Sequence, residues 1–344
     1  MDDELLVAKI RSVAAAANAA CADSTPPARL LAVCSTLEAI ASCDLGGRGI
    51  GALVRPGALA AAAAAFLAAP SVLVLTGFPC RLEAAAPGET DGPSGAVALL
   101  AAARLLGKRA ALATDECNAG PLRAAVAARA AAAGAEVHAF PPRSAAGWAP
   151  GGEHALRLAR LAAAHPHAVA VERTCVAGDG TYRTMRARVM DHLVAPLDAL
   201  LTMGCACGGG DERPYRTSTG IGDGGNECGM GAVRGLVEAH VPRGPEIACV
   251  TPCDHLVVAG VSNWGAWALV AALEVAAALA QRDAPPLLPT PGEEAALECV
   301  LAEQGVGDGV SGQVEPPGSV DGMGVSVHRG VLALLREHLL LAKR

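Results

Sequence analysis

The sequence contains few aromatic residues and few lysines. Aromatic residues make up 2% of the 344 residues and hydrophobic residues 52%, so the core has to consist mainly of alanine, leucine and valine. Lysine occurs only at Lys9, Lys108 and Lys343, and arginine supplies the rest of the 27 basic residues. None of the three lysines lies in a glycine-rich segment. The sequence therefore argues against a pyridoxal enzyme, which forms a Schiff base with a lysine.

The charge balance and the apolar runs argue against two further classes of protein. Charged residues make up 18% of the chain and the net charge is −7, whereas a nucleic-acid-binding protein normally presents a basic face. No charge-free run rich in leucine, isoleucine and valine reaches the roughly 18–20 residues of a membrane span. The apolar segment 57–70 is mostly alanine and predicts a buried helix. We therefore expect neither nucleic acid nor a membrane as a partner.

The N-terminus and the cysteines indicate a cytosol-like compartment. The chain begins Met1-Asp2-Asp3-Glu4, which is the wrong charge for a secretory signal or a mitochondrial presequence. We expect a cytoplasmic protein, and the mitochondrial matrix is the alternative in a eukaryotic cell. Among the twelve cysteines, Cys205-x-Cys207 and Cys249-x3-Cys253 come nearest to metal-ligand pairs, but neither has the two-residue gap of a structural zinc site. We interpret these cysteines as small buried thiols.

From residue 71 onward, short apolar runs alternate with helical segments. Continuous apolar runs of this length are typical of strands buried on both faces, and they predict strands over residues 71–76, 109–114, 136–140, 168–171, 217–221, 246–250 and 255–258. Helices are expected over residues 94–106, 121–133, 154–164, 189–203, 226–238 and 263–281. This alternation predicts an α/β fold: a doubly wound, mostly parallel sheet with helices on both faces, in a Rossmann-like three-layer arrangement.

Helical segments are expected at both ends of this region, within a single domain over residues 1–344. The N-terminal segment, residues 1–45, contains predicted helices over 5–20 and 27–42. The C-terminal extension, residues 284–344, contains predicted helices over 293–304 and 328–343.

Four loops predict one composite site. Ligands of doubly wound sheets bind outside the carboxyl ends of the strands. Loops rich in glycine and polar residues follow predicted strands at that edge, over residues 76–93, 172–188, 220–226 and 259–264.

The densest of these loops contains Gly222, Asp223, Gly224 and Gly225, followed by Asn226 and Glu227. Glycine permits positive φ and close approach of backbone N–H groups to a ligand, while the two carboxylates add acid/base or metal-binding capacity. Residues 220–225 also satisfy G-x-G-x-x-G, so a nucleotide site is an alternative, although Asp223 would place a carboxylate where the pyrophosphate lies. Asn226 and Glu227 can also simply cap a helix.

The other loops contribute further candidate ligand contacts. Glu89 and Asp91 suit an ammonium or a divalent cation, although Asp91 or Ser94 can also simply cap the following helix, and no P-loop lysine is present. Glu172 directly follows a predicted buried strand, where ligand-facing residues tend to lie. Tyr182 can donate a hydrogen bond, and three arginines in the same loop can clamp a carboxylate: Arg173, Arg183 and Arg186.

The last loop carries Ser262 and Asn263, where Ser262 can cap the long helix and Asn263 can point into the crevice. No G-x-S-x-G motif surrounds Ser262, which argues against a serine hydrolase. Turn-like tail segments at 307–312 and 320–322 can fold over the site.

Four segments together resemble the D-glutamate cyclase family, and the resemblance runs from about residue 30 to the end. They are ETDGPSGA at 89–96, ERTCVAGDGTYRTMR at 172–186, GIGDGGNECGMG at 220–231 and GVSNWGAWAL at 260–269. The chain looks like the cyclase domain, which in vertebrates forms the C-terminal half of a mitochondrial protein, in a stand-alone form without the hydro-lyase-like domain of longer members. The resemblance implies a hydro-lyase that converts D-glutamate to 5-oxo-D-proline and releases water.

This chemistry assigns expected roles to the candidate residues. Asp223 or Glu227 is the expected general base, and the N–H groups of residues 222–225 with the Asn226 amide are expected to hold the oxyanion. Substrate contacts are expected from Glu89, Asp91, Glu172, Arg173, Arg183, Arg186, Gly222, Gly224, Gly225, Ser262 and Asn263.

No organic cofactor is expected, and a divalent cation, Mg²⁺ or Mn²⁺, is left open, with Glu89, Asp91 and Asp223 as its candidate ligands. The expected partner is a small amino acid, and a homo-oligomer is left open as well. A nucleotide-dependent enzyme and a non-catalytic amino-acid-binding protein are the two alternative functions.

Overall fold

The computed structural model describes residues 26–203, 217–280, 285–316 and 318–343. The four segments that carry the family resemblance all lie within them. The predicted helix over residues 5–20 and the Cys205-x-Cys207 pair lie outside the described residues.

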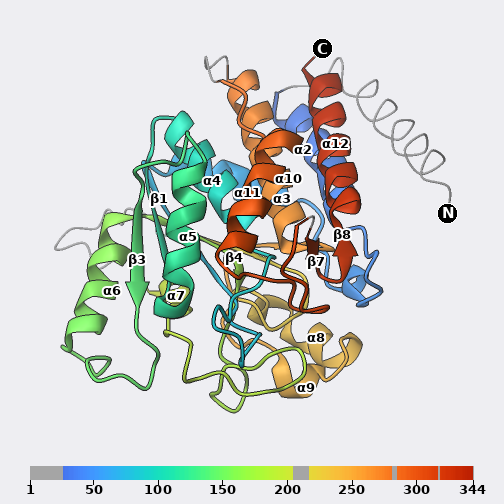
Figure 1. The fold of residues 1–344 in the computed structure, drawn as a ribbon. Coiled ribbons are helices and arrows are strands. Elements are labelled where there is room, and N and C mark those ends of the chain that lie inside the picture. Colours follow the sequence, from blue (N-terminus) through green and yellow to red (C-terminus); the bar gives the residue numbers. More distant parts are fainter. Residues whose placement is uncertain (1–25, 204–216, 281–284, 317, 344) are drawn as a thin grey trace.

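Six parallel strands form the central sheet (Figure 1). Their order across the sheet is β3-β2-β1-β4-β5-β6, so the direction in which the chain adds strands reverses between β1 and β4. This is the doubly wound order, and it confirms the predicted fold class. The strands are β1 (Ser71–Gly77), β2 (Arg109–Asp115), β3 (Glu136–Phe140), β4 (His167–Arg173), β5 (Thr217–Gly222) and β6 (His255–Val258).

Helices cover both faces of the sheet because parallel neighbours have to be joined by right-handed crossovers. The chain moves from β1 to β3 through α4 (Pro93–Leu105) and α5 (Glu116–Ala128), which share one hydrophobic cluster with the later helix α10 (Ser262–Leu279). It then crosses to the other face through α6 (Glu153–Ala164) and α8 (Arg234–His240), which belong to a second cluster. The result is the expected arrangement of three layers.

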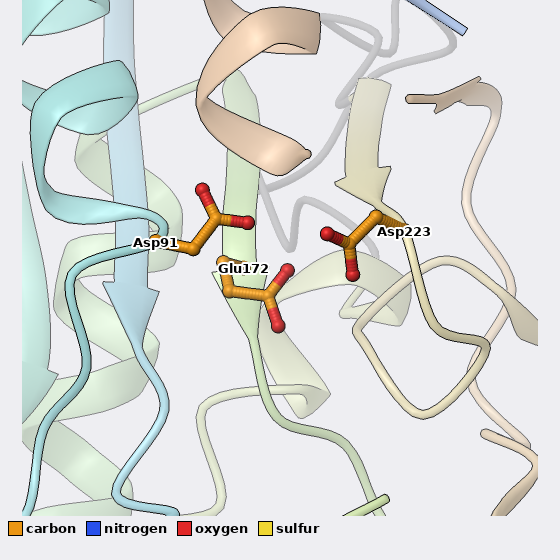
Figure 2. A group of neighbouring side chains, drawn as sticks. All are labelled: Asp91, Glu172 and Asp223. Atoms are coloured by element: carbon orange, nitrogen blue, oxygen red, sulfur yellow. The ribbon is translucent and has the colours of Figure 1, made fainter. Parts of the chain in front are cut away.

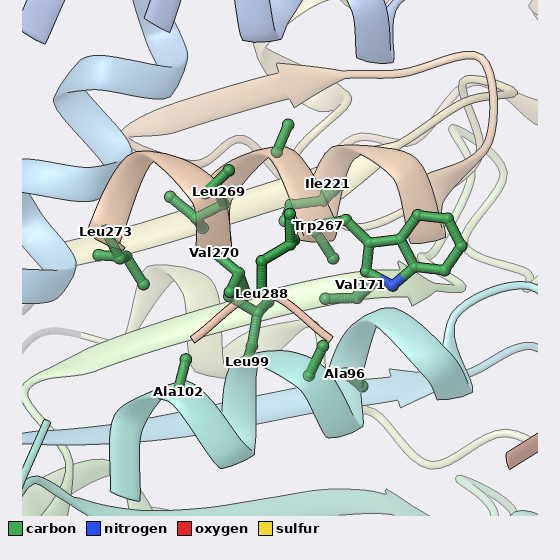
Figure 3. Packing of buried hydrophobic residues seen from close by; sticks show 14 of the residues in the cluster. Ala96, Leu99, Ala102, Val171, Ile221, Trp267, Leu269, Val270, Leu273 and Leu288 are labelled. Carbon is green, nitrogen blue, oxygen red and sulfur yellow. The ribbon is translucent and has the colours of Figure 1, made fainter. Parts of the chain in front are cut away.

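The helix α10 is the centre of the core, and it packs against α4 and the three helices α2 (Pro26–Ala41), α3 (Ala58–Ala68) and α12 (Val325–Ala342). Figure 3 shows its side chains meeting those of α4 next to strands β4 and β5. By length and composition α10 would be able to cross a membrane, but 89% of it is buried inside the protein. Its apolar surface is therefore explained by core packing.

The predicted terminal helices are confirmed as α2, α11 (Pro291–Glu303) and α12, with ends shifted by one to three residues. The helix α11 lies on α5, where its buried Glu294 accepts a hydrogen bond from Ser94 and pairs with Arg129. Residues of α2, α11 and α12 belong to the same hydrophobic cluster as the sheet. The helices α2, α11 and α12 are thus part of the core.

The predicted helix over residues 189–203 is wrong, because only α7 (Ala199–Thr202) is helical there. The backbone of this segment bonds to buried side chains of the sheet instead: Ala195 N donates to Asp115 Oδ1 at 2.7 Å, and Arg173 Nη2 donates to Ala195 O at 2.7 Å. Pro196 follows directly and has no N–H for a helical hydrogen bond. These long-range contacts override the local helical pattern.

Two further predictions fail around the glycine-rich loop. The predicted strand over residues 246–250 is replaced by the short helix α9 (Gly244–Ile247), which a proline at its second position favours. The helix predicted over 226–238 begins only at Arg234, after a 3₁₀ turn, η2 (Gly231–Val233). The N–H groups of Gly229 and Gly231 both donate to Thr251 O, so the backbone there follows the loop and not a helix.

Close packing of α10 on the sheet depends on the absence of a side chain at Gly265. A Cβ atom there would lie 2.7 Å from Ile221 Cγ2 and 3.0 Å from Ala259 Cβ. We expect Gly265→Ala to lower the free energy of unfolding by about 1–3 kcal/mol through overpacking. Urea denaturation followed by circular dichroism measures the change.

The matched control is Gly330→Ala within α12, where a Cβ would meet no atom within 4 Å. Because alanine is the better helix former, this variant should gain up to about 1 kcal/mol. Equal effects of the two substitutions would contradict the packing argument.

Candidate active site

The site lies at the carboxyl ends of β1, β4 and β5, where the strand order reverses. Asp91 follows β1, Glu172 lies near the end of β4, and Asp223 directly follows β5. Figure 2 shows these three side chains coming from three neighbouring segments and facing a common space. The loops after β1, β4 and β5, which the sequence predicted to form one site, therefore do meet in the fold.

The three carboxylates form a compact buried cluster. One oxygen from each lies within 4.8 Å of the others, and the exposed fractions of Asp91, Glu172 and Asp223 are 2%, 5% and 2%. Burial raises the pKa of Asp91 to about 7, and the charge of Asp321 adds to this effect. Burial also raises the pKa of Glu172, followed by repulsion from Glu227 and Asp91, and it raises the pKa of Asp223 against the opposing effect of Arg48. The cluster thus attracts protons or cations.

Asp91 and Asn263 cap each other's helices. Asp91 accepts hydrogen bonds from the backbone N–H groups of Ser262 and Asn263, both at 2.8 Å, at the start of α10. Asn263 Oδ1 accepts from the N–H groups of Gly92 at 3.2 Å and Gly95 at 2.7 Å, at the start of α4. A charged cap at a helix N-terminus is favourable, and the two caps lock the loop after β1 to the loop after β6. Asp91 is thus a cap, but of α10 and not of the helix that follows it in the sequence, and it lies beside Glu172 and Asp223.

Glu172 has an unusual backbone conformation, with a φ of 40°. Positive φ in a residue other than glycine is strained and is common at functional sites. Its Oε2 atom accepts a hydrogen bond from Ser262 Oγ at 2.6 Å. A Cβ at Gly92 would lie 2.8 Å from Glu172 Cβ, so a glycine is needed at position 92 for the two loops to approach.

Arg48 and Asp321 complete the site, and neither was among the residues predicted to act there. Arg48 Nη1 lies 2.7 Å from Asp223 Oδ1, and Arg48 Nη2 lies 2.8 Å from Asp321 Oδ1. The remaining oxygens, Asp223 Oδ2 and Asp321 Oδ2, are buried and have no hydrogen-bond partner within the described part of the chain. The only signal for Arg48 in the sequence is its place between glycines, in Gly46-Gly47-Arg48-Gly49.

Glu227 occupies the backbone donors of the glycine-rich loop. Its two carboxylate oxygens accept from Gly224 N at 2.9 Å and Gly225 N at 2.7 Å. Cβ atoms at Gly222 or Gly224 would lie 2.8 and 2.7 Å from these oxygens, so the glycines make room for Glu227. The N–H groups of Gly224 and Gly225, which were predicted to hold an oxyanion, thus already donate to Glu227. The same contacts argue against a pyrophosphate at this G-x-G-x-x-G sequence.

Asn226 supports the neighbouring loop. Its Nδ2 atom donates to the backbone oxygen of Arg183 at 2.8 Å, while its Oδ1 atom is buried without a partner. The amide thus fastens the loop after β4 to the loop after β5.

The three predicted carboxylate-binding arginines have different surroundings. Arg173 is fully buried, pairs with Asp115 through both Nη atoms and also donates to Gly77 O. Arg183 pairs with Asp179 in the surface loop. Arg186 lines the pocket, where its Nη2 donates to a backbone oxygen of the tail at 3.4 Å. Of the three, Arg186 is the one that the structure places at the pocket.

The pocket has a volume of about 270 Å³, which suits a ligand smaller than a typical drug molecule. The tail lies directly over Glu89, because a Cβ at Gly309 would lie 1.9 Å from Glu89 Oε2. Cys80 Sγ, in the loop after β1, donates to the same oxygen at 3.3 Å. The charged residues that line the pocket are Arg48, Glu89, Glu172, Arg186, Arg188, Asp223, Glu227 and Asp321.

The fold and this pocket define a three-layer α/β protein with an acidic ligand site at the switch point of its sheet. The chain matches the family described as D-glutamate cyclase-like, C-terminal, over residues 37–336, and it belongs to this family. It is 38% identical over 242 residues to the human protein named D-glutamate cyclase, mitochondrial. This match covers 70% of the chain and 38% of the human protein, so the chain corresponds to less than half the length of that relative.

The crowding of carboxylates should make the free protein less stable at high pH. Because the pKa of Glu172 is raised above its ordinary value of 4.5, its contribution to stability is complete below that pH and is lost as the pH rises through the folded-state pKa. Glu172→Gln keeps an acceptor for Ser262 and removes one charge. We expect the variant to gain about 1 kcal/mol at neutral pH or above.

Thermal unfolding of both proteins between pH 5 and 9 measures this difference. The melting temperature of the variant should fall less with rising pH than that of the natural sequence. Glu303→Gln, at an exposed position near the end of α11, is the control. Parallel pH curves for the natural sequence and Glu172→Gln would contradict the repulsion argument.

Proposed function

We propose that this protein cyclises D-glutamate to 5-oxo-D-proline with release of water, as a hydro-lyase. The observation that carries the proposal is membership of the D-glutamate cyclase-like family over residues 37–336, with the family's acidic glycine-rich segments gathered at one pocket. The human relative, 38% identical over the matched region, has the printed name D-glutamate cyclase. The pocket volume of about 270 Å³ is compatible with a molecule of this size.

The acidic cluster supports binding of the substrate ammonium. An α-ammonium carries one positive charge and three N–H donors, and the cluster presents carboxylate oxygens within 4.8 Å of one another. Asp223 Oδ2 is buried without a partner, so it has room to accept a proton from the amine. Its raised pKa makes it a stronger base than an ordinary aspartate.

Asp223 is a better candidate base than Glu227. Burial raises the pKa of Glu227 as well, but both of its oxygens are held by backbone N–H groups, which oppose this rise and fix the carboxylate in place. Glu227 is therefore proposed to shape the loop, with Asp223 as the residue that moves the proton.

The proposed reaction balances without a further reactant. Asp223 accepts a proton from the ammonium, and the freed nitrogen lone pair attacks the γ-carboxyl carbon. The C–N bond of the lactam forms and one C–O bond breaks. In total the nitrogen loses two protons and the departing oxygen gains both, so that it leaves as water.

A divalent cation is the second candidate occupant of the cluster. Three carboxylate oxygens at this separation form a ligand set that Mg²⁺ and Mn²⁺ prefer, and the unpartnered Asp223 Oδ2 points to a missing ligand. The structure groups Asp91 and Asp223 with Glu172, where the sequence had predicted Glu89. A cation there would polarise the γ-carboxylate. Asp321, whose Oδ2 is also buried and unpartnered, would then be the candidate base.

Incubation of the purified protein with D- or L-glutamate tests the function. We expect 5-oxo-D-proline from the D-isomer alone, measured by chiral chromatography. Asp223→Asn should lower kcat by at least about 100-fold if Asp223 moves the proton. Glu246→Gln, a surface carboxylate about half exposed, is the control and should keep full activity.

Two outcomes would contradict the proposal. If D-glutamate raises the melting temperature and no product forms, the protein binds the amino acid without converting it. If NAD or ATP raises the melting temperature and glutamate does not, the nucleotide alternative holds.

Titration with Mn²⁺ after EDTA treatment tests the cation. Because the pKa values of Asp91, Glu172 and Asp223 are raised, protons have to leave when a cation binds, so the affinity should increase from pH 5 to pH 8. Isothermal titration calorimetry in two buffers measures the affinity and the proton release. Glu172→Gln should weaken Mn²⁺ binding at least about tenfold. Full activity in EDTA, with no heat of binding, would assign the cluster to the ammonium.

A further inference from the structure

The substrate proposed above carries two carboxylates, yet the pocket that would receive it is itself acidic. Carboxylate side chains outnumber the three arginines in its lining, and their repulsion has to be offset where a substrate carboxylate binds. The γ-carboxylate is also the electrophile, so positive charge is needed at its oxygens while the amine attacks.

The backbone of the glycine-rich loop does not supply this charge, because Gly224 N and Gly225 N donate to Glu227. The start of α10 is equally occupied, since its N–H groups at Ser262 and Asn263 donate to Asp91. These four N–H groups are therefore not free for an oxyanion, which favours a donor on a side chain.

Two of the three arginines lie toward the outside of the pocket. Arg188 is half exposed and pairs with Glu83 at the surface. Arg186 donates to the backbone oxygen of Val310 in the tail. Arg48 is different, because only 20% of its side chain is exposed and its guanidinium lies against carboxylates of the site.

Arg48 is held in a defined orientation. One Nη atom contacts Asp223 and the other contacts Asp321, at 2.7 and 2.8 Å. Its backbone is fixed as well, because the Asp44 carboxylate accepts from Arg48 N at 2.9 Å and from Gly49 N at 2.7 Å. A guanidinium has five N–H donors, so these two ion pairs leave about three for a ligand. Such a fork is suited to a carboxylate or an oxyanion.

The contact between Arg48 and Asp223 also fits the geometry of ring closure. The attacking nitrogen has to come within about 3–3.5 Å of the γ-carboxyl carbon, so the base and the group that holds the γ-oxygen have to be neighbours. We propose that Arg48 is a catalytic residue that binds the γ-carboxylate of the substrate and stabilises the oxyanion formed when the amine attacks. This assignment rests on the proposed cyclase function.

The closing experiment separates contact with the substrate from a merely structural role. Arg48→Lys keeps the positive charge and loses the fork, while Arg48→Ala removes both. We expect kcat for D-glutamate to fall by about 10²–10³-fold in Arg48→Lys and further in Arg48→Ala. Added methylguanidinium should restore at least about a tenth of the lost activity to Arg48→Ala. Arg234→Lys, in a surface ion pair with Glu238, is the matched control and should behave as the natural sequence.

A second measurement does not depend on turnover. Glutarate has the two carboxylates of the substrate and no amine, so its binding reports on the anion site alone. Calorimetry should show at least about tenfold weaker glutarate binding to Arg48→Lys than to the natural sequence and to Arg234→Lys. This readout stays valid even if the natural sequence forms no 5-oxoproline, an outcome that would contradict the cyclase function and leave Arg48 assigned as an anion-binding residue.

Two results would overturn the assignment of Arg48. One is kcat in Arg48→Lys within about threefold of the natural sequence. The other is a loss of activity with unchanged glutarate affinity and no effect of methylguanidinium, which would show that Arg48 acts only by holding Asp223 and Asp321 in place.

Discussion

The reciprocal capping of two helices by Asp91 and Asn263 is the interaction on which the site depends. Asp91 lies in the loop after β1 and caps α10, and Asn263 begins α10 and caps α4. The two helices lie side by side in the core, where α10 is buried over nearly its whole length. The positions of α4 and α10 therefore fix the loops after β1 and β6. Ser262, at the start of α10, is in this way held close enough to Glu172 to donate a hydrogen bond to it. A rigid apolar core thus holds a small set of polar groups in place at its edge.

The buried carboxylates of the pocket lower the stability of the folded protein. Glu89, Asp91, Glu172 and Asp223 are buried close together, and burial raises the pKa of each carboxyl group. Such an arrangement is costly in a free protein, and a bound ammonium or metal ion would reduce this cost. Arg48 supplies part of the missing charge from within the chain. The strained backbone of Glu172 likewise lowers the free energy gained on folding.

Much of the fold was predictable because its signals are local. Short apolar runs predicted strands at 71–76 and 136–140, and the alternation with helices predicted a parallel sheet, which the structure confirms. The position of the site followed from the same reasoning, because parallel strands end at one edge. The predicted helices were wrong where groups distant in the sequence form hydrogen bonds with the backbone. Asp115 and Arg173 bond to Ala195 and prevent the helix predicted there, and Thr251 holds the loop at Gly229 and Gly231.

By itself, the sequence determined the class of fold, the family and, Asp321 excepted, the acidic residues that meet at the pocket, because each of these depends on patterns within short segments. Only the tertiary structure decided which role each group is free to take. It assigned the loop amides to Glu227, the Arg173 guanidinium to Asp115, and a position beside Asp223 to Arg48, from a loop some 175 residues earlier in the chain. The physical reason is that an N–H group already bonded to one acceptor is not free for another, and that the partner of a donor or a charge is chosen by distance in space and not by distance along the chain.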